Sequence, residues 1–420
     1  MTTFSEFTLR PSSMKALDAM GIHTPTPIQE RTIPVLLEKR DLIAQAQTGS
    51  GKTLAFALPI MEHCDPNRRE VQAVVLTPTR ELARQVGSVL HDLSQGSNLR
   101  VTLLYGGVGY GPQESALRRG SQVVVGTPGR VLDHLRKKTL RLDQLRLFIL
   151  DEADEMLDRG FAPDVERIMA MTPKDRLTAM FSATTPEWVQ KVSKKHMIDP
   201  EVITSEDEES EPDIEQVVMD VFREDKFQVL LRLLKEPLEG TTVVFGRTKH
   251  GVRNLGKKLD GMGFQVSVLE GNLGQNQRDR ALGRFRDGKS DILVATNVAA
   301  RGLDVLHIAR VINFDVPDTA ELLTHRIGRT GRMGRSGQAI TLLTSTDLSK
   351  WHEIERKLGV KLPRIPAPGA RKPSDSKHVP LHKQAQNGAS NGTMQSASSK
   401  PKGFGGKRFG RRGGRRLARA

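Results

Sequence analysis

The sequence has very little cysteine and no long apolar run. Cys64 is the only cysteine among 420 residues, which excludes an internal disulfide framework and indicates a reducing compartment. We expect Cys64 to be a small buried side chain. No apolar stretch approaches the roughly 18 residues that span a bilayer, and the start, MTTFSEFTLRPSSMK, lacks the pattern of a signal peptide. Together these features predict a cytoplasmic protein.

Acidic residues are scarce at the end of the chain. Residues 364–420 contain fourteen Lys and Arg but a single acid, Asp375, and so carry +13 of the net charge of +15. The preceding residues are therefore almost balanced in charge. A segment dominated by Pro, Ser, Gly, Asn and basic residues cannot bury enough apolar surface to fold. We predict that residues 364–420 are a disordered basic tail, and that its partner is nucleic acid.

Short apolar runs alternate with helical patterns through the rest of the chain. Runs such as DLIAQA (41–46) and DILVAT (291–296) are separated by amphipathic stretches, which predicts parallel sheets with crossover helices on both faces. The alternation is interrupted by SEDEESEP (205–212), which we interpret as an acidic interdomain linker. The fold class is therefore α/β, with two similar domains over residues 1–204 and 213–363.

A phosphate-binding loop is predicted where AQTGSGKT follows an expected strand and opens an expected helix. Glycines let the backbone approach phosphate oxygens, and the helix N-terminus favours negative charge. Lys52 is expected to reach the β- and γ-phosphates, and the Thr53 hydroxyl to ligate Mg²⁺. Ala46 stands where the general pattern has glycine, so a chance match in a glycine-rich loop is the alternative. The predicted nucleotide-binding residues of the loop are Ala46, Gln47, Thr48, Gly49, Ser50, Gly51, Lys52 and Thr53.

Two acids are delivered to the same sheet edge by the apolar run LRLFIL, which precedes the sequence DEAD. Open α/β sheets bind ligands at the carboxyl ends of their strands. Asp151 is suited to hold Mg²⁺ through water, and Glu152 to polarise the attacking water. The structural alternative is an acidic cap for the following helix, but the upstream phosphate loop favours catalysis. ATP and Mg²⁺ are the cofactors that these two motifs predict.

The motifs AQTGSGKT, PTRELA, TPGR, DEAD, SAT, ARGLD and HRIGRTGR follow one another along the chain. This ordered set resembles that of the DEAD-box RNA helicases, bacterial type, from Phe4 to about residue 345. The resemblance implies two tandem RecA-like domains with parallel sheets, ahead of the disordered tail. It implies RNA-stimulated ATP hydrolysis coupled to local unwinding of RNA duplexes or remodelling of RNA–protein complexes. It also implies RNA as partner and a monomeric core.

The resemblance further implies an adenine-recognition segment upstream of the phosphate loop. Gln29 would read adenine through a side chain that both donates and accepts hydrogen bonds. Ile22 replaces the aromatic residue that the family usually has before PTPIQ, which affects stacking but not the Gln29 contact. The residues that match this segment are Phe4, Pro25, Thr26 and Gln29.

Several elements of the first domain are similar to the family's RNA-backbone contacts. Helix N-termini, hydroxyls and Arg side chains suit phosphates and ribose but carry no base information. For each motif alone, ordinary turn and capping chemistry is the alternative. Ser182 and Thr184 are similar to the motif that couples hydrolysis to strand separation. The matching RNA residues are Pro78, Thr79, Arg80, Gly106, Gly107, Thr127, Pro128, Gly129 and Arg130.

The second domain is expected to complete the ATP site from the other side. In HRIGRTGR, glycines between the arginines favour a tight surface presented to a ligand over a solvated charged face. By resemblance, Arg329 and Arg332 are arginine fingers that stabilise transition-state charge, and His325 links them to DEAD and SAT. Asn297 replaces the usual acid after Thr296, which weakens an expected charge link to the arginine motif. Further matches are Gly302 and Asp304 for ATP or its ribose, and Arg247, Thr248, Arg278 and Thr296 for RNA.

Hydrolysis should require domain closure, because ATP binds mainly to the first domain while the fingers lie on the second. Preference for RNA should come from ribose 2′-hydroxyl contacts. Three other functions are alternatives. A transport ATPase of the ABC class is disfavoured because LSQGS (93–97) lies more than fifty residues before DEAD. A non-catalytic RNA-binding scaffold predicts losses at Lys52, Glu152 or Arg329, and all three are present. A DNA helicase would be distinguished by stimulation with DNA.

Overall fold

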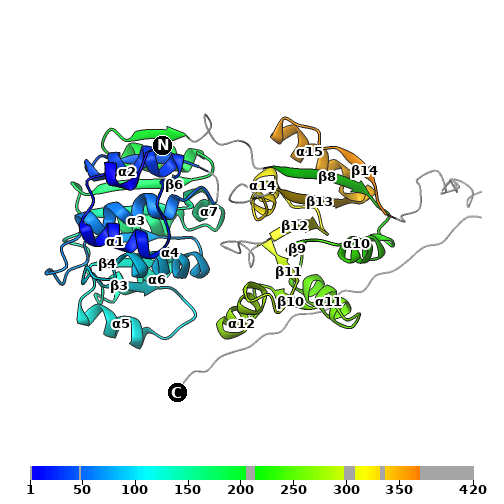
Figure 1. Cartoon of the computed structure of the whole chain (residues 1–420), viewed down its shortest axis with the longest axis horizontal. Coiled ribbons are helices and arrows are strands. Elements are labelled where there is room, and N and C mark those ends of the chain that lie inside the picture. The colour runs from blue at the N-terminus through cyan, green and yellow to red at the C-terminus, as the bar shows by residue number, and fades with distance from the viewer. Residues whose placement is uncertain (1, 47–48, 205–212, 298–307, 332–335, 369–420) are drawn as a thin grey trace, which may run out of the picture. The chain divides into compact units, whose positions relative to one another are not determined.

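The computed structural model describes residues 2–46, 49–204, 213–297, 308–331 and 336–368 (Figure 1). These residues form two seven-stranded sheets in which every pair of neighbouring strands is parallel. Helices connect the successive strands and cover the sheets. The tandem RecA-like α/β architecture predicted from the sequence is therefore confirmed.

The first sheet has the strand order β3-β4-β2-β5-β6-β1-β7. Its strands are β1 (Leu42–Gln45), β2 (Ala73–Leu76), β3 (Val101–Leu104), β4 (Val123–Gly126), β5 (Leu147–Asp151), β6 (Leu177–Ser182) and β7 (Glu201–Thr204). Its helices are η1 (Phe4–Glu6), α1 (Pro11–Ala19), α2 (Pro27–Leu37), α3 (Lys52–His63), α4 (Arg80–Leu93), α5 (Tyr110–Arg119), α6 (Pro128–Arg136), α7 (Ala153–Asp158), α8 (Ala162–Met169) and α9 (Glu187–His196).

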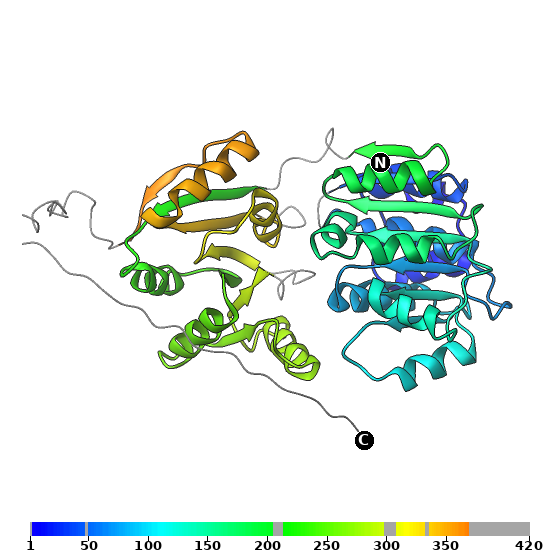
Figure 2. The same cartoon turned by 180° about the vertical axis from the view of Figure 1, so that it is seen from behind.

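The first sheet is buried on both faces, which explains its short, continuously apolar strands. Along β2, Ala73 and Val75 face one core, while Val74 and Leu76 face the other. Helices α1 to α4 cover the first face (Figure 1), and α6 to α9 cover the second (Figure 2). Cys64 is fully buried in the first core, and burial raises the pKa of its thiol to about 12. The expected structural role of Cys64 is confirmed.

The second sheet has the order β10-β11-β9-β12-β13-β8-β14. Numbered from its own first strand, this is the same order as in the first sheet. Its strands are β8 (Ile214–Asp220), β9 (Thr241–Gly246), β10 (Val266–Leu269), β11 (Ile292–Thr296), β12 (Ile308–Asn313), β13 (Gly337–Leu343) and β14 (Arg364–Pro366). Its helices are α10 (Lys226–Lys235), α11 (Lys249–Asp260), α12 (Gln275–Arg286), α14 (Ala320–Ile327), η2 (Ser345–Asp347) and α15 (Leu348–Leu358).

The last strand lies in a segment that the sequence pattern assigned to the tail. Residues of β14 pair with β8 from Arg364↔Val218 to Pro366↔Asp220, and Arg364 also bonds the Asp220 carboxylate at 3.0 Å. The second sheet therefore continues past Pro363. The sequence pattern did not predict this strand, because RIP is only three residues long and contains a proline. Proline disfavours most strands but is tolerated at the edge of a sheet. The linker 205–212 and residues 369–420 lie outside the described residues.

The order of the strands positions the motifs. In the first sheet β5, β6 and β1 are consecutive neighbours, so the loops after them meet at one carboxyl edge. These loops carry DEAD, SAT and the phosphate-binding motif. The fold thus brings together three motifs that are spread along the chain from Ala46 to Thr184.

Candidate functional site

The phosphate loop leads from β1 into α3, as predicted. Gly49 and Gly51 have φ values of 96° and 95°, which only glycine adopts without strain. A Cβ added to Gly51 would lie 2.5 Å from Nε2 of Gln29. Lys52 is buried, and its Nζ donates to the Ala46 carbonyl at 2.6 Å, across the loop. Gln47 and Thr48 lie outside the described residues.

The upstream segment is bonded to the phosphate loop. Thr26 Oγ1 donates to the Ser50 carbonyl at 2.8 Å, and Gln29 Nε2 donates to the Gly51 carbonyl at 2.9 Å. Gln29 Oε1 accepts from the Thr26 backbone N–H at 3.0 Å, within the first turn of α2. An amide has two N–H donors and two acceptor lone pairs, so one of each is left for a ligand. Gln29 therefore connects any nucleotide it contacts to the phosphate loop.

Phe4, which matches the adenine-recognition segment by resemblance, is part of the first core. Its side chain is 2% exposed and belongs to the first core, where its ring meets Phe7 edge-on at 6.0 Å. Phe4 is the first residue of the short helix η1 and its only buried residue. Ile22 packs partly buried against the same core, and Pro25 is also half-buried.

Two buried carboxyl groups end β5 and begin the next turn. Asp151 and Glu152 are 3% and 7% exposed, and Glu152 has φ 53°, which is strained for a non-glycine residue. Burial raises the pKa of Asp151 to about 6, against the opposing effect of Lys52. Burial, reinforced by Glu155, also raises the pKa of Glu152, while the charge of Arg329 opposes the rise. Lys52 and Arg329 thus both act on the acids of this motif.

The oxygen donors at this edge fit a Mg²⁺ ion. Oε2 of Glu152 is buried and has no hydrogen-bond partner among the described residues, and Thr53 adds a hydroxyl on the first turn of α3. In the described part of the chain, no three His, Cys, Asp or Glu side chains are grouped to hold a metal by themselves. Mg²⁺ commonly uses one or two carboxylates together with substrate phosphates. Asp151, Thr53 and a nucleotide would supply such a set.

Asp154 connects the DEAD and SAT motifs, a role that the sequence did not reveal. Its Oδ2 accepts from the backbone N–H of Ala183 at 3.2 Å, and from the N–H and Oγ1 of Thr184 at 3.0 Å each. The Asp154 backbone N–H donates to Ser182 Oγ at 3.2 Å. Ser182 and Thr184 are thus both bonded to the DEAD motif. The only signal in the sequence was the last acid of DEAD itself.

The arginine motif of the second domain is anchored by Arg326, which the sequence analysis did not single out. Its guanidinium donates from Nε to Asn297 Oδ1 at 2.7 Å, and from Nη1 to Asn313 Oδ1 at 2.9 Å. Burial lowers the pKa of Arg326 to about 10. The link that was expected to weaken at Asn297 is therefore present, but it is a hydrogen bond to a neutral amide.

The other residues of the arginine motif follow α14. Arg329 is 4% exposed, and its Nε donates to the His325 carbonyl at 3.1 Å. His325 is half-buried on the last turn of α14. Thr296, which ends β11, is buried, and its hydroxyl has no hydrogen-bond partner among the described residues. Gly302, Asp304 and Arg332 lie outside the described residues.

The predicted RNA elements of the first domain meet at the ends of β2, β3 and β4. Arg80 lies against the loop after β3. Its guanidinium is so close to Gly107 that a Cβ added to this glycine would clash with Nη1 of Arg80. Arg130 donates to the Val108 carbonyl at 3.1 Å and stacks 4.0 Å above the Tyr110 ring. Thr79 and Thr127 are the N-terminal caps of α4 and α6, with Pro78 before the first and Pro128, Gly129 and Arg130 after the second. The structure thus places these residues side by side, with Gly106 and Gly107 between the arginines.

The predicted RNA residues of the second domain make polar contacts in the structure. Arg247 bonds Asp347 at 3.1 Å, and Thr248 caps α11 by accepting from Gly251 N–H at 3.0 Å. Arg278 forms an ion pair with Glu81 of PTRELA at 2.8 Å. RNA binding through Arg278 would therefore have to displace or share this carboxylate.

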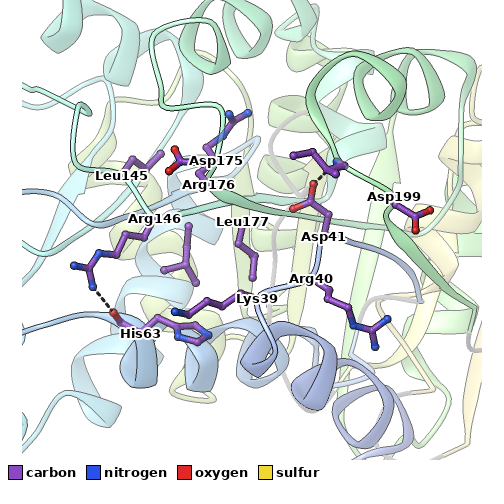
Figure 3. Close-up of a pocket in the computed structure, with 12 residues that line it drawn as sticks. Lys39, Arg40, Asp41, His63, Leu145, Arg146, Asp175, Arg176, Leu177 and Asp199 are labelled. Carbon is purple, nitrogen blue, oxygen red and sulfur yellow. Dashed lines mark hydrogen bonds between the residues drawn. The ribbon is translucent and has the colours of Figure 1, made fainter.

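A cavity of about 560 Å³ lies at the opposite edge of the first sheet (Figure 3). It is found where β1, β5 and β6 begin, and its basic residues are balanced by Asp41, Asp175 and Asp199. Both carboxylate oxygens of Asp41 accept backbone N–H groups, from Thr178 and Ile198. This cavity is separate from the residues that carry the motifs. Among the described residues, no helix is both long and apolar enough to cross a membrane.

Comparisons with known proteins identify the family of the chain. Residues 26–192 match the DEAD/DEAH box helicase model, and residues 225–334 match the helicase conserved C-terminal domain model. The DEAD-box ATP-dependent RNA helicase CshA of Geobacillus kaustophilus is 43% identical over 369 residues, which cover 88% of this chain and 79% of that protein. The ATP-dependent RNA helicase CshA of Listeria monocytogenes is 44% identical over 369 residues, covering 88% and 71% respectively. The structure of S. cerevisiae Dbp5 bound to RNA and ADP BeF3 matches with a TM-score of 0.79 and 35% identity, over 87% of this chain and 96% of that one. The chain belongs to the DEAD/DEAH box helicase family.

Proposed function

We propose that this ATP-dependent RNA helicase hydrolyses ATP at the carboxyl edge of its first sheet, with Arg329 completing the site. The observation that carries this proposal is the electrostatics of Glu152. Burial raises the pKa of this carboxyl, while the charge of Arg329 opposes that rise. A catalytic carboxylate that responds to a guanidinium from the second domain links hydrolysis to domain closure.

The residues of the first domain bind the nucleotide and hold its metal. Lys52 exchanges its bond to the Ala46 carbonyl for the β- and γ-phosphates, while the N-terminus of α3 supplies N–H groups. Thr53 and Asp151 would hold Mg²⁺, which would neutralise phosphate charge when bound. Gln29 uses its remaining N–H and lone pair on adenine. A nucleotide held in this way would connect adenine recognition to the shape of the phosphate loop.

Glu152 orients and polarises the attacking water, and the arginines stabilise the charge that develops on the γ-phosphoryl group. The free Oε2 of Glu152 is the atom suited to accept a hydrogen bond from that water. Arg329 acts with Arg332, and His325 connects them to DEAD and SAT. Gly302 and Asp304 complete the ATP contacts from the second domain.

RNA contacts are proposed on both domains, and they are contacts to the backbone. Arg80, Arg130 and the caps Thr79 and Thr127 offer guanidinium, hydroxyl and helix N-terminal donors, which suit phosphates. Arg247, Thr248, Arg278 and Thr296 are the corresponding residues of the second domain. Because Asp154 bonds Thr184 and Ser182, a change at the ATP site reaches the SAT loop through side-chain hydrogen bonds.

We also propose the organisation and setting of the chain. Residues 1–204 and 213–368 form the two domains, joined by the linker 205–212, and residues 369–420 act as a basic RNA tether. The protein works in the cytoplasm as a monomeric core, on duplex and single-stranded RNA and on ribonucleoprotein complexes. A single cysteine and an RNA substrate support this assignment.

Replacing Glu152 by Gln tests the proposal. Gln keeps the shape of the side chain but cannot act as a carboxylate, so we expect near-normal ATP binding and a loss of hydrolysis of at least about a hundredfold. The variant should accumulate as a complex with ATP and RNA. Binding is measured with a fluorescent nucleotide, and hydrolysis by phosphate release with RNA or single-stranded DNA as the stimulating strand. Near-normal turnover by Glu152→Gln would contradict the assigned role, and equal stimulation by DNA would contradict the RNA specificity.

A further inference from the structure

A basic pocket lies at the amino-terminal edge of the first sheet, where β3 and β4 begin. Its volume is about 700 Å³, and among the described residues that line it none is acidic. Arg69, Arg100 and Arg119 line it together with His91 and the hydroxyl of Ser121. All three arginines are exposed. We call these three residues the edge arginines.

Local structure uses only part of this positive charge. Helices α4 and α5 both end at the pocket, and a helix C-terminus carries roughly half a negative charge. Arg100 neutralises part of this negative charge, since its Nη1 donates to the carbonyl of Arg119, the last residue of α5, at 2.5 Å. Three guanidinium groups against two helix ends leave a local excess of about +2. Within the described part of the chain, none of the edge arginines forms an ion pair with a carboxylate, although Glu70 is adjacent to Arg69 and Glu114 precedes Arg119 by five residues.

The cavity in Figure 3 provides a contrast. It also contains arginine and lysine side chains, but three aspartates line it with them. The pocket of the edge arginines has no carboxylate among its described lining residues. Its uncharged polar lining residues include Ser, Asn and Gln. A polyanion is the ligand class that this composition suits.

The same elements that flank the predicted RNA contacts at Gly106, Gly107 and Arg130 also reach the pocket. Helix α5 begins at Tyr110, whose ring lies 4.0 Å beneath Arg130, and ends at Arg119 in the pocket. Strand β3 begins beside Arg100 and ends just before the glycine loop at Gly106 and Gly107. The ten residues of α5 span about 15 Å, which corresponds to four or five steps of about 3.4 Å along a nucleic-acid strand. A short RNA flank leaving the predicted core contacts can cover that distance.

We propose that the edge arginines bind the phosphate backbone of RNA that flanks the strand held by the helicase core. The inference rests on the proposed RNA path over Arg80 and Arg130. Arg side chains suit phosphates geometrically, and such contacts are independent of base sequence. The pocket extends the RNA footprint of the first domain and favours substrates with a structured arm over a bare single strand.

The test uses the full chain with Arg69→Gln, Arg100→Gln and Arg119→Gln combined. A matched control combines Arg136→Gln, Arg141→Gln and Arg167→Gln, which remove the same charge from exposed positions of the same domain. Three RNAs are compared: a short single strand that the core alone accommodates, the same strand with a duplex arm at its 5′ end, and the same strand with a duplex arm at its 3′ end. RNA-stimulated ATPase and fluorescence anisotropy are measured at several salt concentrations.

We expect the edge variant to need about tenfold more of an extended RNA for half-maximal ATPase, and to lose about two from the slope of log affinity against log salt. Its maximal rate and its response to the short strand should match those of the control. Equal affinities of edge variant and control for both extended RNAs would overturn the inference. An equal loss of affinity for the short strand would also overturn it, because the arginines would then contribute to RNA binding by the helicase core or to folding. Absence of RNA stimulation in the unmodified chain would instead refute the proposed function.

Discussion

Replacing Asp151 by Asn should stabilise the ligand-free protein while it abolishes Mg²⁺-dependent hydrolysis. In the folded chain, burial raises the pKa of this carboxyl from 3.8 to about 6, so the ionised form is disfavoured in the native state. At pH values above both the unfolded and the folded pKa, the buried Asp151 carboxylate lowers the free energy of unfolding by about 3 kcal/mol through linkage. Asn removes the charge, although its buried amide needs partners of its own, worth roughly 1–3 kcal/mol if they are missing. We therefore expect a net gain of about 0–2 kcal/mol.

The pH dependence has a definite sign. Below the unfolded pKa of about 3.8 the carboxyl is neutral in both states, so wild type and variant should differ little. The advantage of Asn should appear as the pH rises from about 4 to 6, and then remain constant. Thermal unfolding of the ligand-free chain across this range measures it, with an expected rise of several degrees at neutral pH. ATP with Mg²⁺ should stabilise the wild type and not the variant. A variant that melts below wild type at neutral pH would refute the reasoning.

Three further predictions follow from other contacts. Arg329→Ala should bind ATP nearly normally but hydrolyse it about 10³-fold more slowly at saturating RNA; steady-state kinetics that showed lost binding instead would indicate a structural role. Asn297→Asp should give Arg326 a charged acceptor in place of a neutral one and raise the melting temperature of the second domain, as calorimetry can check; a lower melting temperature would mean that the carboxylate is not accommodated. Truncation after residue 368, which preserves β14, should raise the RNA concentration for half-maximal ATPase and flatten its salt dependence. Superimposable ATPase curves would show that the tail does not capture RNA.

The sequence predicted the parallel sheets and the meeting of the motifs, because both follow from the period of apolar residues and from strands that end in motif residues. It could not predict which side chains hold the motifs in place. Asp154 and Arg326 make their contacts with residues distant in sequence, and no local pattern distinguishes them from neighbouring charged residues. The burial of the Phe4 ring was likewise not predictable, since whether an aromatic ring is buried in the core depends on the turn that η1 makes.

The common strand order of the two sheets has a consequence for stoichiometry. Lys52 is the first residue of the helix after the first strand of its sheet, and Lys226 has the corresponding position after β8. In the second domain that lysine is paired at 3.3 Å with Asp315, which follows β12 as Asp151 ends β5. The preceding residues, VFRED, include no glycine to wrap around a phosphate. In the second domain an ion pair thus occupies the position that corresponds to the proposed nucleotide site of the first domain. Each chain should therefore turn over ATP at one centre only.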